Sequence, residues 1–215
     1  LDYLELMSFY MKEQKSKYFK EYSSKYNLLL ALNYNYQGKQ NNAIDILMPF
    51  IDKKNVDIIS QLNIYLSLIV FYLQKNELKK VQNLCSKFYH TDKYYIEKTG
   101  IEWTIKKNII EILLQIDLGN IDIVESRLLS FKRAYFTHLK NIHQEKVITF
   151  LKLVEIYYKN PEISTSKDFE AKVEASFEWI GKEKEDIFIM SFFAWLKAKM
   201  TKQDLYLVTL DFMKN

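Results

Sequence analysis

The stretch YNLLLALNYNYQGKQNNAIDILMPFI, residues 26–51, indicates the fold class of the chain. Its first half is apolar enough for a helix that is buried on several sides. Its second half places Ala43, Leu47 and Phe50 three and four residues apart, which is the spacing of one helical face. Gly38, between the two halves, adopts a positive φ at no steric cost and therefore suits the end of a helix. The stretch predicts two helices joined by a tight turn.

The same unit recurs along the chain: an apolar helix, a short polar turn and a second helix with a narrower apolar stripe. We predict further turns at Asn76 and Gly119. Helical hairpins of this kind cannot bury their apolar faces alone, so they stack on their neighbours. We therefore predict an all-α fold, with one helical repeat domain over residues 1–215 and no sheet. Its hairpins are expected at about residues 23–53, 56–89, 101–136, 144–180 and 184–213, after a leading helix at about residues 2–22.

The first hairpin resembles a tetratricopeptide repeat (TPR). That family has a Leu followed by a small residue in the first helix, an aromatic residue three positions on, and a Gly at the turn. Leu30-Ala31, Tyr34 and Gly38 match these positions. The likeness covers about residues 23–136, and the turns are spaced more widely than the 34-residue period of the family. The chain is TPR-like, and the next two hairpins keep part of the pattern at Leu68, Tyr72, Phe88 and Gly119.

The resemblance implies a right-handed α-solenoid with a concave groove that is lined by the first helix of each hairpin and binds a peptide or protein partner. Some TPR proteins hold the terminal carboxylate of a peptide with Lys, Asn and Arg side chains. Lys25 and Lys106 stand at the two lysine positions. Leu29, Ser67 and Ile110 replace the other three, so this clamp is incomplete. The partner-binding residues that the resemblance implies are Lys25, Asn35, Tyr36, Asn63, Gln74 and Lys106.

The composition argues against several other functions. The net charge of +4 is small, and Arg127 and Arg133 are the only arginines, so specific nucleic-acid binding is not expected. The three histidines do not share a helical face at metal-ligand spacing, and Cys85 lies on an apolar stripe. No phosphate-binding loop, G-x-S-x-G or H-E-x-x-H motif occurs. We expect a protein that is not an enzyme, without a catalytic site, a metal site or a cofactor.

The leading hypothesis is a non-catalytic scaffold for protein–protein interactions. The alternative is a regulatory sensor domain that binds a peptide or small ligand and controls an upstream effector domain. Because the chain begins at Leu1, within the repeating pattern, we expect it to be part of a longer protein. The single cysteine is compatible with the reducing cytoplasm, where we expect the protein to act, and no apolar run is long enough to span a membrane.

The segment FYHTDKYYIEKTGIEW, residues 88–103, is dense in aromatic residues and lies between two predicted hairpins. One interpretation is an extended connection that packs over the core. The other is an anchor for a partner, because Tyr and Trp are common at the centres of protein interfaces. The sequence leaves both interpretations open.

Overall fold

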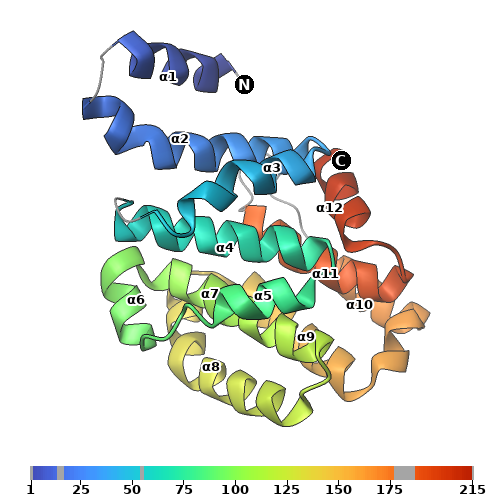
Figure 1. Ribbon diagram of the computed structural model, residues 1–215. Coiled ribbons are helices and arrows are strands. Elements are labelled where there is room, and N and C mark those ends of the chain that lie inside the picture. The colour runs from blue at the N-terminus through green and yellow to red at the C-terminus, as the bar shows by residue number, and fades with distance from the viewer. Residues whose placement is uncertain (1, 14–16, 54–55, 177–186, 215) are drawn as a thin grey trace. The chain divides into compact units, whose positions relative to one another are not determined.

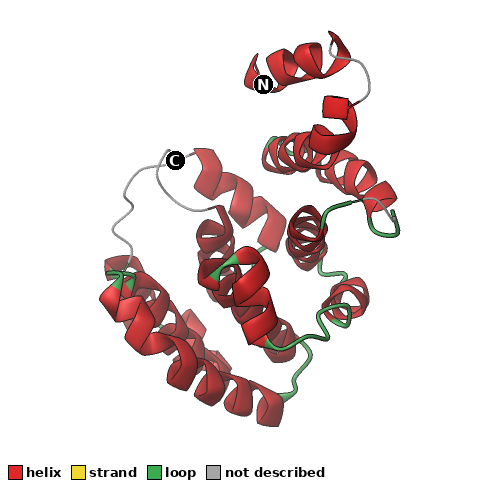
Figure 2. Ribbon diagram, turned by 90° about the vertical axis from the view of Figure 1, so that its left-hand side faces the viewer, coloured by secondary structure: helices red, strands yellow, loops and turns green. Residues whose placement is uncertain are grey.

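The computed structural model describes residues 2–13, 17–53, 56–176 and 187–214. Within these ranges all regular structure is helical, as the sequence predicts, and Figure 2 shows helices and loops without a strand. The chain divides into two compact units, residues 1–100 and residues 101–215, where the sequence predicts a single array. The stacking of all hairpins into one solenoid stays a prediction.

The first unit consists of six α-helices and one short 3-10 helix among the described residues (Figure 1). They are α1 (Asp2–Glu13), α2 (Lys17–Tyr36), α3 (Gln40–Leu47), η1 (Met48–Phe50), α4 (Ile58–Gln74), α5 (Leu78–Cys85) and α6 (Asp92–Thr99). Two of the predicted hairpins are present here, as α2 with α3 and α4 with α5. Helix α2 also packs against α1, and α4 also contacts α2, α3 and α6. The two hairpins therefore stack, with α4 in the middle of the unit.

Helix α4 occupies this central place because it has no polar face in its second half. Every residue from Ile64 to Gln74 is buried, and most of them are aliphatic or aromatic. A helix that is apolar all round has to be covered on all sides. Its first turn is more polar and begins at Asp57, whose side chain accepts a hydrogen bond from the backbone N–H of Ser60 at 2.9 Å.

The second unit is also built of six α-helices and one short 3-10 helix among the described residues (Figure 1). Its elements are α7 (Ile101–Asp117), α8 (Ile121–Asn141), α9 (Glu145–Lys159), η2 (Pro161–Thr165), α10 (Lys167–Ala175), α11 (Ile187–Thr201) and α12 (Leu205–Lys214). Helices α7, α8 and α9 pack consecutively, α9 and η2 contact α11, and α11 packs against α12. Helix α11 resembles α4 in being buried on all sides, since every residue from Met190 to Leu196 is buried.

Five of the described helices end in the same backbone motif. Gly38, Asn76 and Gly119 have positive φ angles of 85°, 56° and 74°, and all three are at the predicted turns. In each case the next residue donates its N–H to the carbonyl five positions back, as Lys39 does to Tyr34 at 2.8 Å. His143 and Lys202 end α8 and α11 in the same way, with φ of 55° and 52°. One compact helix stop therefore recurs along the chain.

The structure corrects three expectations about the elements. The leading helix predicted for residues 2–22 is wrong as one helix, because α1 ends at Glu13 and residue 17 already belongs to α2. The segment of residues 88–103 is not an extended connection, since α6 lies inside it. The third hairpin continues past residue 136 to Asn141. The predicted end of the fourth hairpin, at residue 180, and the start of the fifth, at residue 184, lie outside the described residues.

Helices α8 and α9 are joined by charged side chains as well as by apolar packing. The Lys132 ammonium lies 2.5 Å from the Glu155 carboxylate, and Lys159 reaches the same carboxylate at 3.1 Å. The hydrogen bond from Lys132 holds the pKa of the Glu155 carboxyl below its usual value; burial opposes this shift, and the bond from Lys159 adds to it. The contact therefore stabilises the fold only while Glu155 is ionised.

Enlarging the small residues of the first hairpin tests its packing. Ala31 on α2 and Ala43 on α3 are both 0% exposed, and these two helices pack together. We expect Ala31→Leu and Ala43→Leu each to lower the free energy of unfolding by about 1–3 kcal/mol, because a tightly packed contact has no room for three more carbons. Urea denaturation measures this. Ala134→Leu on the exposed face of α8 is the control and should change it by less than about 0.5 kcal/mol. Equal effects at all three positions would show that the hairpin is not closely packed.

The Lys132–Glu155 contact predicts a dependence of stability on pH. The lowered pKa of folded Glu155 means that the contact contributes stability above the unfolded pKa of about 4.3 and loses it as the pH falls through the folded pKa. We expect Lys132→Met to have a lower free energy of unfolding than the parent at pH 7. This difference in free energy should become smaller as the pH falls towards 3. Denaturation at a series of pH values measures it. Lys152→Met, on the exposed side of α9, is the control. The difference between its free energy of unfolding and that of the parent should be the same at every pH.

Candidate functional site

Three carboxamide side chains meet inside the first unit. The Asn35 side chain of α2 donates to Gln74 Oε1 of α4 at 3.0 Å. Gln40, at the start of α3, donates to the Phe71 carbonyl at 3.2 Å and approaches Gln74 Oε1 at 3.5 Å. Asn35 is 0% exposed and Gln74 is 2% exposed. These amides link the first hairpin to the second from within the core.

This arrangement changes the interpretation of the predicted partner-binding residues. The placement of Asn35 and Gln74 on an open helical face is wrong, because the two side chains face each other in the interior. Lys25 is exposed on α2, while Tyr36 and Asn63 are half-buried. The sixth residue, Lys106, lies on α7 of the second unit. The partner-binding role of these four residues stays a prediction.

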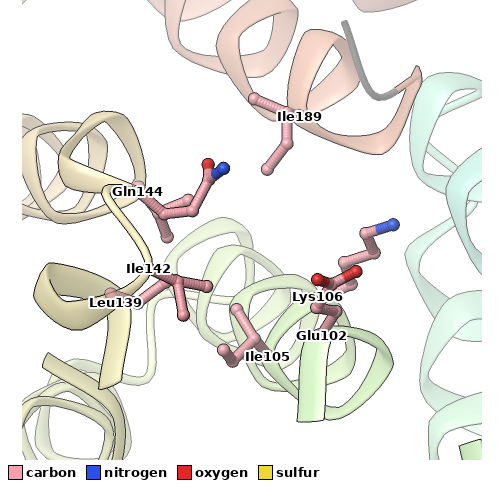
Figure 3. Close-up of a pocket in the computed structure, with 8 residues that line it drawn as sticks. Glu102, Ile105, Lys106, Leu139, Ile142, Gln144 and Ile189 are labelled. Atoms are coloured by element: carbon pink, nitrogen blue, oxygen red, sulfur yellow. The ribbon is translucent and has the colours of Figure 1, made fainter. Parts of the chain in front are cut away.

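Lys106 lines a pocket in the second unit (Figure 3). The cavity has a volume of about 120 Å³. Its walls come from α7, from the α8–α9 turn with the adjoining helix ends, and from the start of α11. The residues that line it are Glu102, Ile105, Lys106, Leu139, Ile142, Gln144, Val147 and Ile189.

The pocket has an apolar floor and a mixed rim. Ile105, Leu139 and Val147 are at most 5% exposed, whereas Glu102 and Gln144 are exposed. Behind the pocket, Val147 and Ile189 pack with Phe150 and Phe192. The space between these side chains is too small for a water molecule. The pocket therefore ends blindly against packed core.

The turn that carries Ile142 and Gln144 is built by the helix stop described above. His143 has a φ of 55°, and the backbone N–H of Gln144 donates to the Leu139 carbonyl at 2.8 Å. This bond directs the chain back along α9 and leaves Ile142 and Gln144 at the mouth of the pocket (Figure 3). On the opposite wall, the ammonium of Lys106 stands 5.1 Å from the centre of the Phe188 ring, a cation–π distance.

Two other polar clusters in the second unit are closed. Asp117, at the end of α7, accepts a hydrogen bond from Trp195 Nε1 at 3.0 Å and pairs with Lys199 at 2.7 Å. The Glu111 carboxylate lies between Lys107, at 3.3 Å, and Arg127. Both clusters join neighbouring helices, and neither lines the pocket. We assign them to packing.

The aromatic segment of residues 88–103 contributes both to the core and to the surface. Phe88 and Tyr95 are buried and contact each other, with ring centres 5.9 Å apart. Tyr89 is 79% exposed and packs on His90, whose ring stacks on Tyr94 at 4.0 Å. The partner-anchor interpretation therefore stays open for Tyr89.

The pocket brings the predicted residue Lys106 together with Glu102 and Gln144, which were not among the predicted residues. Glu102 and Lys106 are four residues apart on α7, which is the spacing of one helical face. Gln144 carried no signal, because the turn at His143 was not predicted. Within the described ranges, no three or more His, Cys, Asp or Glu side chains gather closely enough to hold a metal ion. Cys85 is half-buried and does not line the pocket.

Comparison with protein-family models, with curated proteins and with solved structures gave no match to this chain. Among the helices described, none combines the length and the apolar character needed to cross a membrane.

A double-mutant cycle tests the packing role of the buried amides. Asn35→Ala leaves Gln74 without its closest donor inside the core, so we expect the free energy of unfolding to fall by about 1–3 kcal/mol. Gln74→Ala should cost a similar amount, and the two losses should not add, because they remove the same bond. Asn33→Ala on the same helix is the control, since its side chain bonds only the Leu29 carbonyl of its own turn. An effect of Asn35→Ala as small as that of Asn33→Ala would contradict the packing role.

Proposed function

We propose that this chain is a non-catalytic protein-interaction module whose second unit holds one side chain of a partner protein in the pocket. The observation that supports this is the blind cavity of about 120 Å³ with an apolar floor and a polar rim. Hot spots of protein interfaces have this form: one side chain fills a desolvated pocket, and polar groups surround it.

The size of the cavity distinguishes between classes of ligand. Pockets for cofactors and drug-sized ligands are about 300–1,000 Å³. The cavity of about 120 Å³ is well below this range, so it suits one side chain better than a cofactor. The size favours a protein or peptide partner over the small-ligand form of the sensor hypothesis.

The fold is compatible with the same proposal. Stacked hairpins such as α2–α3 and α4–α5 resemble TPR units, and helical repeats of this type commonly bind other proteins. In a right-handed solenoid the first helix of each hairpin lines the groove, and α7, which supplies Glu102 and Lys106, is such a first helix. The groove remains part of the proposal, with the pocket as its anchor point.

Ile142 at the pocket rim allows a matched test. A photo-crosslinking residue at position 142 should capture a partner from the source cell that the same residue at position 156 does not. With that partner purified, we expect Ile142→Gln to weaken binding by about tenfold, which corresponds to about 1.4 kcal/mol of lost apolar contact. Isothermal titration calorimetry measures the affinity.

Ile156→Gln is the control for this test. Ile156 is 37% exposed, almost the same as Ile142 at 38%, but it does not line the pocket. Its replacement should leave the affinity within a factor of about two and the thermal stability unchanged. If both replacements weaken binding equally, or neither does, the pocket is not the anchor.

A further inference from the structure

Two polar groups at the pocket mouth have unused hydrogen-bonding capacity. Glu102 and Gln144 lie on opposite walls, and Figure 3 shows both side chains reaching towards the space between them. Neither side chain forms a hydrogen bond or ion pair with any other residue in the described part of the chain. An apolar occupant would remove water from these groups without replacing its hydrogen bonds, at a cost in free energy.

Glu102 and Lys106 bring one charge of each sign to the wall of the pocket. Glu102 is in the first turn of α7, where a negatively charged side chain complements the helix dipole. Lys106, one turn further along, directs its ammonium over the Phe188 ring and away from the centre of the pocket (Figure 3). The Glu102 carboxylate and the Gln144 carboxamide therefore border the space for the occupant (Figure 3), and the Lys106 ammonium lies over the Phe188 ring.

The shape of the cavity limits the occupant further. An apolar cavity of about 150 Å³ holds a benzene ring, and this one has about 120 Å³, so its volume favours a slender side chain over a bulky one. The floor of Ile105, Leu139 and Val147 requires an apolar stem. Lysine combines an unbranched apolar stem with a compact ammonium group that has three donors, whereas the guanidinium of arginine is planar and wider.

We propose that the partner side chain held in this pocket is a lysine. Its four methylenes pack on the apolar floor, and its ammonium donates hydrogen bonds to the Glu102 carboxylate and the Gln144 carbonyl oxygen at the rim. This inference rests on the proposed function, because it names the chemistry of the partner at the same site. The partner segment is accordingly basic at the residue that enters the pocket.

The test uses three small probes with the whole chain: the Nα-acetyl N-methylamides of lysine, norleucine and glutamic acid. Norleucine has the same straight stem as lysine without the ammonium group. The isoleucine methyl signals of residues 105, 142 and 189, followed by NMR, report binding at the pocket. We expect lysine to bind in the millimolar range, at least about fivefold more tightly than norleucine, and glutamic acid to show no measurable binding.

Glu102→Gln is the decisive variant. It should weaken lysine binding to the affinity of norleucine and leave the affinity for norleucine unchanged. Glu170→Gln, the same charge change at an exposed position of α10, is the control and should alter neither affinity. Equal binding of lysine and norleucine to the parent, or tighter binding of glutamic acid, would overturn the lysine inference and leave the pocket as an anchor for another side chain. If no probe moves the three methyl signals, the pocket holds no partner side chain, and the proposed function fails with it.

Discussion

The burial of two helices that lack a polar face is the constraint on which the rest of the structure depends. Helices α4 and α11 each contain a run of consecutive buried residues, from Ile64 to Gln74 and from Met190 to Leu196. Such helices are stable in water only when other helices surround them. In the first unit α2, α3, α5 and α6 contact α4, and in the second α9, η2 and α12 contact α11. The pocket lies beside the start of α11, where Ile189 and its neighbours leave space that packing does not fill.

Polar groups in the interior select one arrangement of these covering helices. Glu111 is 7% exposed and Lys107 is 5% exposed, so their charges would be costly if they were unpaired. Arg127 from α8 contacts the same carboxylate, and this joins α7 to α8. Ion pairs of this kind add little net stability compared with apolar contacts, but losing one partner is strongly unfavourable. Their main effect is therefore to raise the free energy of alternative helix pairings, in which a charge would be buried without its partner.

The helices and turns could be predicted where residue type alone determines the backbone. Gly38, Asn76 and Gly119 are residue types that tolerate a positive φ, and all three predicted turns are present. His143 and Lys202 adopt the same conformation. The sequence predicts a connection between residues 136 and 144, but not the helix stop at His143 that forms the pocket mouth. Asn35 and Gln74 were assigned to an open face because periodicity identifies the apolar side of a helix but not which flank the next hairpin covers. Lys106 was predicted as a binding residue from the resemblance to the TPR family, which stays a prediction, and its position beside Glu102 and Gln144 became evident only from the three-dimensional arrangement.

The buried amides also bear on how the chain avoids folding errors. Neighbouring helical hairpins have similar apolar faces, so a helix can dock one turn out of place with little loss of apolar contact. Asn35 and Gln74 are matched only when α2 and α4 are correctly aligned. A shift by one turn would leave two dehydrated carboxamides without partners, and such a misdocked intermediate would separate again rather than persist. The Asn35–Gln74 hydrogen bond thus favours the native alignment of the first two hairpins over a shifted one.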